Sequence, residues 1–274
     1  MKMRLSVEGH DYRVDMSAEI NIAIPLSFDR AQPNHFGAEY ASAEVLQDGE
    51  FIGDTTLGGS CNVRRLHITP HCNGTHTESV SHIVNQPIAV GQLAQSLLPA
   101  TLITVIPSLA KDTFDSYTHA LTDNDKVISK SALVTELSSI DSPWVEALIV
   151  RTLPNEEVKK TLTYNNDNQP PFFTHDAIDY LIEKGVKHLI VDFPSIDKMY
   201  DHGLLSNHRR FWNVAIGTHA ITEHTRIDQT ITELAFIAND INDGHYLLSL
   251  NIAPFETDAA PSRPVLYPME LLND

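Results

Sequence analysis

A helix that leads directly into a buried strand is the sequence feature that most limits the fold of this chain. Thr174 is a favoured N-cap residue, and the apolar residues of segment 177–182 recur at the spacing of one helix face. Gly185 suits the position after a helix, and residues 186–191 follow as the short apolar run of a buried strand. This order predicts an α/β fold, in which helices pack on a sheet.

Further apolar runs predict that strands make up much of the remaining chain. They are residues 4–7, 12–14, 20–24, 100–105, 144–152, 234–237, 246–252 and 265–267. Segment 28–60 is rich in Gly, Asp, Asn and Ala without a clear period, so we expect a long functional loop there. No linker rich in Pro, Gly or Ser divides the 274 residues. We therefore predict a single α/β domain over residues 1–274, with much β structure.

The charge of the chain argues against nucleic-acid binding. Asp and Glu number 36 against 19 Lys and Arg, and the resulting net charge of −17 repels a phosphate backbone. No stretch approaches the roughly 18 consecutive apolar residues of a membrane span, and the N-terminus lacks the apolar core of a secretory signal. The two cysteines, Cys61 and Cys72, do not make a disulfide framework. We expect a cytoplasmic protein that acts on a small molecule, without nucleic-acid or membrane partners.

One short segment gathers many metal-binding side chains. The sequence from His71 to His82, HCNGTHTESVSH, includes three His, one Cys and one Glu, in a chain that has 14 His. Imidazole, thiolate and carboxylate together suit Zn²⁺, and Mn²⁺ is the alternative where the thiol is not used. The segment therefore predicts a metal site. An open coordination position would hold a water of lowered pKa, the usual hydrolytic nucleophile.

The expected backbone decides which of these side chains converge. Pro70 and Gly74 disfavour a helix, so we expect an extended chain in which Cys72, His76 and Glu78 share one face.

The two outer histidines meet this site only under stated conditions. In an extended chain His71 points to the face opposite that of Cys72, His76 and Glu78. It reaches their site only if the backbone turns near Gly74. His82 has the right parity but lies about 20 Å from His76 on a straight strand, so the chain must bend after Glu78.

The segment resembles a pattern of the putative cyclase family, which includes bacterial-type kynurenine formamidase and isatin hydrolase. That pattern is H-x-G-T-H-x-D-x-P-x-H, and residues 74–76 match its G-T-H while His82 matches its last His. In an ungapped register Cys72 stands at the first His. Glu78 replaces the Asp and Val80 replaces the Pro.

Four other segments are similar to family segments, and they extend the resemblance over most of the chain. They are residues 22–26 (IAIPL), 147–152 (ALIVRT), 185–197 (GVKHLIVDFPSID) and 258–266 (DAAPSRPVL). The resemblance implies a β-rich core of the swivelling β/β/α type, up to two bound metals, and a homodimer or homotetramer.

The resemblance also implies roles for individual residues. The first ligand is Cys72, which the register favours, or His71, which the residue type favours. His76 and Glu78 follow as ligands, and His82 acts in proton transfer.

A later His and Glu complete the metal site in the family. We assign them to His208 and Glu233, with Glu223 as the competing Glu because an insertion lies near residues 217–226. The Gly-Thr-His at 217–219 is interpreted as coincidence. His35 and Phe36 fall in the loop where the family places aromatic substrate contacts.

The acids that follow the buried strand have a simpler interpretation. Asp192, Asp197 and Asp201 are expected to be solvated residues of a strand-end turn. Phe211 and Trp212 are expected in the core.

The resemblance implies a metal-dependent amidohydrolase of a C–N bond, in an aryl formamide such as N-formylkynurenine or in a cyclic amide such as isatin. Attack by a metal-held hydroxide and proton delivery from His82 would cleave the bond. A non-catalytic metal- or ligand-binding member of the fold is the alternative, and a metal-assisted cyclase or lyase is a further one. A serine-hydrolase motif G-x-S-x-G is absent from the sequence.

Overall fold

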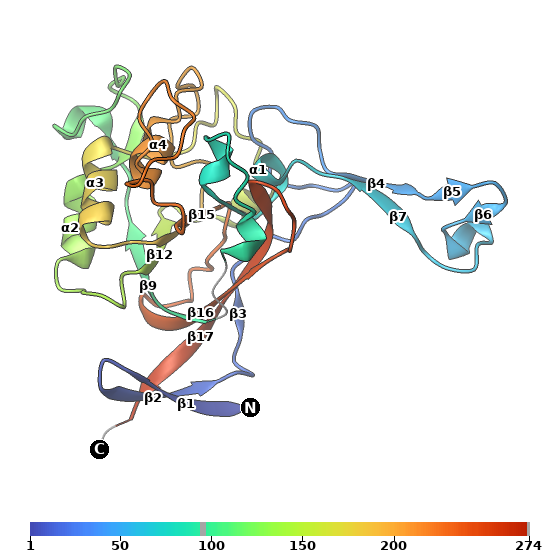
Figure 1. Ribbon diagram of the computed structural model, residues 1–274, viewed down its shortest axis with the longest axis horizontal. Helices are drawn as coiled ribbons and strands as arrows, with labels where there is room; N and C mark the ends of the chain where they lie inside the picture. The colour runs from blue at the N-terminus through green and yellow to red at the C-terminus, as the bar shows by residue number, and fades with distance from the viewer. Residues whose placement is uncertain (94–96, 273–274) are drawn as a thin grey trace.

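A closed ring of strands forms the centre of the molecule (Figure 1). The computed structural model describes residues 1–93 and 97–272. Within these residues, seven strands follow one another around the ring, and the pairing of β8 with β17 closes it. In ring order they are β17 (Ala259–Leu271), β16 (Gly244–Ile252), β9 (Leu98–Val105), β12 (Ala147–Thr152), β14 (His188–Val191), β15 (Thr230–Glu233) and β8 (His76–Glu78).

The N-terminal strands extend the sheet from β17. β2 (His10–Asp15) and β3 (Ile20–Asn21) both pair with β17, and β1 (Lys2–Val7) pairs with β2. The N-terminus and β1 and β2 therefore lie at the lower end of the view in Figure 1.

Three helices cover one side of the ring (Figure 1). They are α2 (Lys130–Leu137), α3 (His175–Glu183) and α4 (Ser206–Trp212). The predicted helix is confirmed as α3, because the Thr174 side chain accepts a hydrogen bond from the backbone N–H of Ala177. Gly185 follows with φ of 86°, a conformation that glycine adopts without steric cost.

Alternate residues of the parallel strands β9, β12 and β14 serve two separate cores. In β12, Leu148 and Val150 contact the helices, whereas Ala147 and Ile149 point into the ring. Because both faces are buried, these strands are continuous apolar runs. The ring of strands with its layer of helices is a β-rich α/β core, which confirms the predicted fold class.

Segment 28–60 is not the single loop that its composition suggested. It contains part of a projecting arm (Figure 1), built from β4 (Ser42–Val45) paired with β7 (Arg64–His67) and β5 (Gln47–Asp48) paired with β6 (Phe51–Ile52). Two-residue strands are too short to show an alternation of apolar and polar residues, so the sequence pattern did not reveal them.

The remaining elements are short. β10 (Ser108–Leu109), β11 (Lys126–Ile128) and β13 (Phe172–Phe173) form a small sheet. The 3₁₀ helices are Thr55–Leu57, Val80–His82, Val90–Gln92, Ala110–Asp112 and Glu157–Thr161. Within the described ranges, no helix has both the length and the apolar character needed to cross a bilayer.

Two sequence predictions near the functional segment were wrong. A one-turn helix, α1 (Pro70–Asn73), precedes the strand, because proline is well tolerated in the first turn of a helix. The strand expected at residues 234–237 lies earlier, as β15, because Leu234 has a φ of 55° and the backbone turns there.

Candidate metal centre

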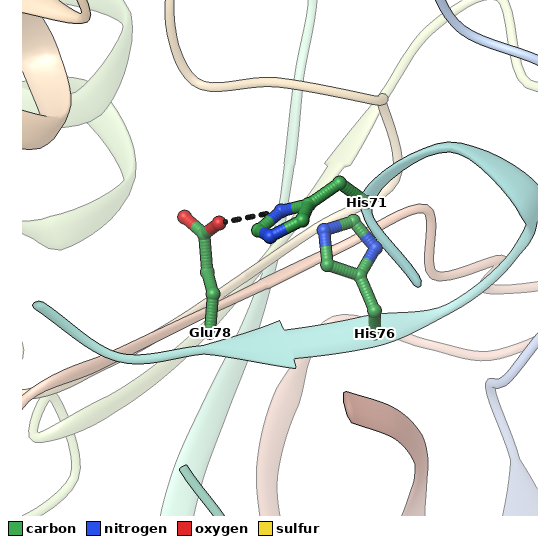
Figure 2. Close-up of side chains that lie close together, drawn as sticks. All are labelled: His71, His76 and Glu78. Atoms are coloured by element: carbon green, nitrogen blue, oxygen red, sulfur yellow. Dashed lines mark ion pairs between the residues drawn. The ribbon is translucent and has the colours of Figure 1, made fainter. Parts of the chain in front are cut away.

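Strand β8 presents His76 and Glu78 on the same face of the sheet. Figure 2 shows both side chains rising from one side of the strand, as alternation along a strand requires. The neighbouring strand β15 places Glu233 directly opposite His76. Nε2 of His76 lies 3.5 Å from Oε2 of Glu233. Two strands distant in sequence therefore bring an imidazole and two carboxylates together.

The turn of α1 adds His71 to this cluster. Its Nδ1 lies 3.1 Å from Oε2 of Glu78, the ion pair drawn in Figure 2. The prediction from an extended chain, which favoured Cys72, fails because the helical turn changes which residue faces the strand. Among the described residues, neither Cys72 nor Glu233 belongs to the groups of three or more donors that could share a metal ion, but Glu233 lies within 3.6 Å of both His76 and His208.

His82 reaches the same carboxylate because the chain bends where the hypothesis requires. The 3₁₀ helix Val80–His82 follows directly after Ser79, whose side chain accepts a hydrogen bond from the N–H of Ser81. Nε2 of His82 then lies 4.0 Å from Oε2 of Glu78.

Helix α4 contributes the last imidazole, His208. Its Nε2 lies 2.7 Å from Oε1 of Glu78 and 3.6 Å from Oε1 of Glu233. The opposite ring nitrogen, Nδ1, lies 2.6 Å from Oδ2 of Asp197. The structure therefore brings His208 and Glu233 to the segment that begins at His71, as the resemblance implied.

Glu223, the competing acid, does not reach the cluster. Its side chain is 86% exposed, and its ion pair is with the adjacent His224, at 3.5 Å. His219 also lies elsewhere, with Nδ1 2.8 Å from the carbonyl oxygen of Ile83.

The donor atoms of the cluster fit a divalent cation. Ligand atoms within 4.8 Å of one another occur in three overlapping groups, which are His71–His76–Glu78, His71–His82–Asp258 and Glu78–His82–His208. In the described part of the chain, Nε2 of His76, Nε2 of His208 and both oxygens of Glu78 are buried and make no well-formed hydrogen bond, although Nε2 of His208 and Nδ1 of His71 lie close to Glu78. Buried polar atoms normally have partners, so these atoms indicate a missing ligand.

Each imidazole is fixed through its other nitrogen. Nδ1 of His76 lies 3.1 Å from the carbonyl oxygen of Gly74, and Asp197 holds Nδ1 of His208. A hydrogen bond to one ring nitrogen leaves the other free as a lone pair for a metal. The inward nitrogens of both rings are therefore prepared to accept a cation.

The charges of the cluster support one another. Burial alone would raise the pKa of Glu78, but the facing imidazoles of His208, His82 and His71 hold it well below its usual value. Burial likewise opposes the charged form of His208, yet Glu78 and Asp197 raise its pKa well above the usual value. For His71, burial is outweighed by Asp258 and Glu78, and the pKa rises to about 10. These imidazoles neutralise the buried carboxylates.

Two carboxylates of the site were missed by the sequence analysis. Asp197 was expected to be solvated, but it is buried and accepts hydrogen bonds from His208 and from Oη of Tyr117, at 2.6 Å. Asp192 and Asp201 are buried as well, so the interpretation as solvated acids was wrong for all three. The second missed acid, Asp258, lies beside His71 and His82.

His35 and Phe36 lie on a loop near His76. His35 is 1% exposed, and neither ring nitrogen has a hydrogen-bond partner among the described residues. Burial, together with the nearby His76, lowers its pKa to about 3. The Phe36 ring centre lies 3.9 Å from that of His35, and Phe36 is exposed with a φ of 55°. A non-glycine residue held in this conformation is strained, and such strain often marks a functional site.

Thiol chemistry finds little support at this site. Burial, and to a smaller extent Glu233, raises the pKa of Cys72 to about 11. Phe211 and Trp212 lie in the core beneath His208, which confirms that prediction.

Comparisons with known proteins show which family the chain belongs to. The model of the putative cyclase family matches residues 14–198. A kynurenine formamidase of Bacillus cereus is 28% identical over 217 residues, which cover 77% of this chain and 82% of that protein. The kynurenine formamidase of Bacillus cytotoxicus is 25% identical over 216 residues, with the same two coverages.

Solved structures share the fold at lower identity. A predicted metal-dependent hydrolase from Bacillus stearothermophilus superposes with a TM-score of 0.57 at 16% identity, covering 91% of this chain and 97% of that one. Isatin hydrolase A from Labrenzia aggregata gives 0.58 at 13% identity, covering 92% and 94%. Because the family model matches well over half of the residues, this chain belongs to the putative cyclase family.

Proposed function

We propose that this protein is a metal-dependent hydrolase of a C–N amide bond. The observation that carries the proposal is a set of buried metal-binding atoms on His76 and Glu78 of β8 and on His208 of α4, which face one another and make no well-formed hydrogen bond. The relatives named kynurenine formamidase and isatin hydrolase support the choice of amide hydrolysis.

The residues that would hold the metal are those that the fold brings together. We assign His71, His76, Glu78, His208 and Glu233 as ligands, with Glu78 central because three imidazoles face its two oxygens. Zn²⁺ is the proposed ion, since a mixed imidazole and carboxylate set suits it, and Mn²⁺ is the second choice. Such an ion supplies a Lewis acid for the substrate carbonyl and lowers the pKa of water.

His82 is the proposed catalytic residue. Its Nδ1 lies 3.3 Å from Asp258, so Nε2 faces the cluster and can carry a proton. The nitrogen that departs from a cleaved amide needs a proton, and a partly exposed imidazole can deliver it from Nε2.

The substrate is proposed to be an aryl formamide or a cyclic aryl amide. Phe36 offers an exposed aromatic face, and the neutral imidazole of His35 offers a buried donor and acceptor beside it. An aromatic ring with a carbonyl group would match this pair, by stacking and by a hydrogen bond.

We also propose that the chain forms a homodimer or homotetramer. The arm of β4–β7 and β5–β6 projects from the body and exposes Leu57 and Leu66 (Figure 1). An isolated two-stranded ribbon is only marginally stable, so contact with a second copy would support it. Light scattering tests this, and a particle mass of one 30.5 kDa chain would contradict it.

The test of the catalytic proposal uses purified full-length protein. Elemental analysis should find a divalent metal, and a chelator should abolish hydrolysis of N-formylkynurenine or isatin, with activity returning after Zn²⁺ or Mn²⁺ is added. Metal-loaded protein that hydrolyses neither compound, nor a small cyclic imide, refutes the proposal. If that protein still binds such a compound, the non-catalytic alternative is correct.

A further inference from the structure

Asp258 lies next to the cluster because of strand pairing. It immediately precedes β17, whose first residue, Ala259, is opposite Glu78 in the register of β17 with β8. The backbone N–H of Ser79 donates to the carbonyl oxygen of Asp258 at 2.9 Å. The backbone of Asp258 is thereby fixed relative to Glu78.

The side chain of Asp258 contacts two imidazoles at once. Its Oδ2 lies 2.9 Å from Nε2 of His71 and 3.3 Å from Nδ1 of His82. The two rings lie against each other, with centres 4.2 Å apart and planes 30° from parallel. One carboxylate oxygen therefore joins residues that come from two different turns of the chain.

The nitrogens that face away from Asp258 point at one acceptor. Nδ1 of His71 lies 3.1 Å and Nε2 of His82 lies 4.0 Å from Oε2 of Glu78. In the neutral form that binds a metal, each ring donates its outer N–H to Asp258 and keeps a lone pair on the nitrogen that faces Glu78. The carboxylate of Asp258 thus selects opposite tautomers in the two rings.

We propose that Asp258 is a positioning residue that fixes the orientation and tautomer of both His71 and His82. The inference rests on the proposed function, because it assigns His71 to metal binding and His82 to proton transfer. It also explains how a histidine one residue before the family position can serve. The helical turn brings His71 near the cluster, and the hydrogen bond to Asp258 fixes which of its nitrogens faces Glu78.

The experiment measures metal affinity, which needs no substrate. Full-length Asp258→Ala, Asp258→Asn and a control, Glu256→Ala, are titrated with Zn²⁺ against a chromophoric chelator. Glu256 is an exposed acid on the same segment. We expect a 10–100-fold loss of affinity for the Ala variant, the usual effect of removing such a partner. The Asn variant should lose less, because its one carbonyl oxygen can still accept a hydrogen bond. The control should stay within twofold of wild type.

A double-mutant cycle separates orientation from general damage. His71→Ala should reduce affinity strongly in the wild-type background and much less in Asp258→Ala, because the partner that orients His71 is already gone. Additive losses would overturn the proposal. Unchanged affinity in Asp258→Ala would also overturn it.

Stoichiometry distinguishes an orienting residue from a direct ligand. The number of Zn²⁺ ions per chain should be the same in Asp258→Ala and wild type at saturating metal, and loss of one ion would overturn the orienting role. If wild type binds no divalent ion, the proposed function itself fails. If wild type binds tightly and Asp258→Ala does too, only this inference fails.

Discussion

Replacement of Asp197 by asparagine should weaken both folding and metal binding. The buried carboxylate accepts four short hydrogen bonds. The donors are Oη of Tyr117 (2.6 Å), Nδ1 of His208 (2.6 Å), and the backbone N–H groups of Asn207 (2.7 Å) and His208 (3.1 Å). Tyr117 and Asn207 share Oδ1, and His208 uses Oδ2 for both of its donors. Asparagine has one carbonyl oxygen. With its NH₂ group in place of Oδ2, both donors of His208 lose their acceptor; with the NH₂ group in place of Oδ1, the N–H of Asn207 does, while the Tyr117 hydroxyl can turn and accept.

The expected loss of stability follows from the orientation in which both hydrogen bonds from His208 are lost. A hydrogen bond to a charged group contributes about 1.5–3 kcal/mol net, so Asp197→Asn should lower the free energy of unfolding by about 3–6 kcal/mol. With the NH₂ group toward His208, the ring must protonate Nε2, the nitrogen that faces Glu78. Metal affinity should then fall by about 10–100-fold.

Urea denaturation of chelator-treated protein measures the first effect, and a Zn²⁺ competition titration measures the second. Asp179→Asn is the matched control, because Asp179 contacts the same helix through an exposed ion pair with Arg210, at 2.9 Å. That change should cost less than about 1 kcal/mol and leave metal affinity unchanged. An Asp197→Asn variant that binds Zn²⁺ as tightly as the Asp179→Asn control would refute the reasoning.

Four further substitutions test other parts of the protein. His82→Ala should lower kcat by about 100-fold or more, because proton delivery is lost, while elemental analysis finds the metal content unchanged. The Cys72→Ser variant should bind the metal as wild type does, whereas His71→Ala should lose it. The opposite result would mean that Cys72, and not His71, is the first ligand. Burial lowers the pKa of His188, so below about pH 6.5 this residue binds a proton in the unfolded chain but not in the folded one. As the pH is lowered below about 6.5, the free energy of unfolding should therefore decrease by up to about 1.4 kcal/mol per pH unit. In urea denaturation, His188→Gln should make this pH dependence weaker. An unchanged pH dependence would mean that His188 does not cause it.

Local signals in the sequence predicted the parts of the fold that local physics controls. The Thr174 cap and Gly185 mark the ends of α3, because caps satisfy free backbone groups within a few residues. The run that became β14 is apolar throughout, since both of its faces are buried. The family resemblance rested in part on the spacing from His76 to His82. A short 3₁₀ helix makes the bend that brings His82 near Glu78.

The missed features depend on contacts between distant segments. Asp258 lies beside Glu78 only because β17 pairs with β8, and no local pattern specifies that register. Asp197 is buried because α4 folds back over it, so its acidic turn resembles an ordinary solvated one in sequence. The first ligand was ambiguous because a single helical turn at residues 70–73 decides whether His71 or Cys72 faces the strand.

The same imidazoles that neutralise the buried acids must release protons when a cation replaces them. The pKa of His71 is raised to about 10, and that of His208 is also raised, so both are protonated at neutral pH while they face Glu78 directly. A metal ion takes the lone pairs of neutral imidazoles, and binding therefore expels these protons. Affinity for Zn²⁺ must then rise with pH, by about tenfold per unit for each proton released. Competition titrations between about pH 6 and pH 8 measure this slope, and an affinity that does not change with pH would mean that these two rings are not metal ligands.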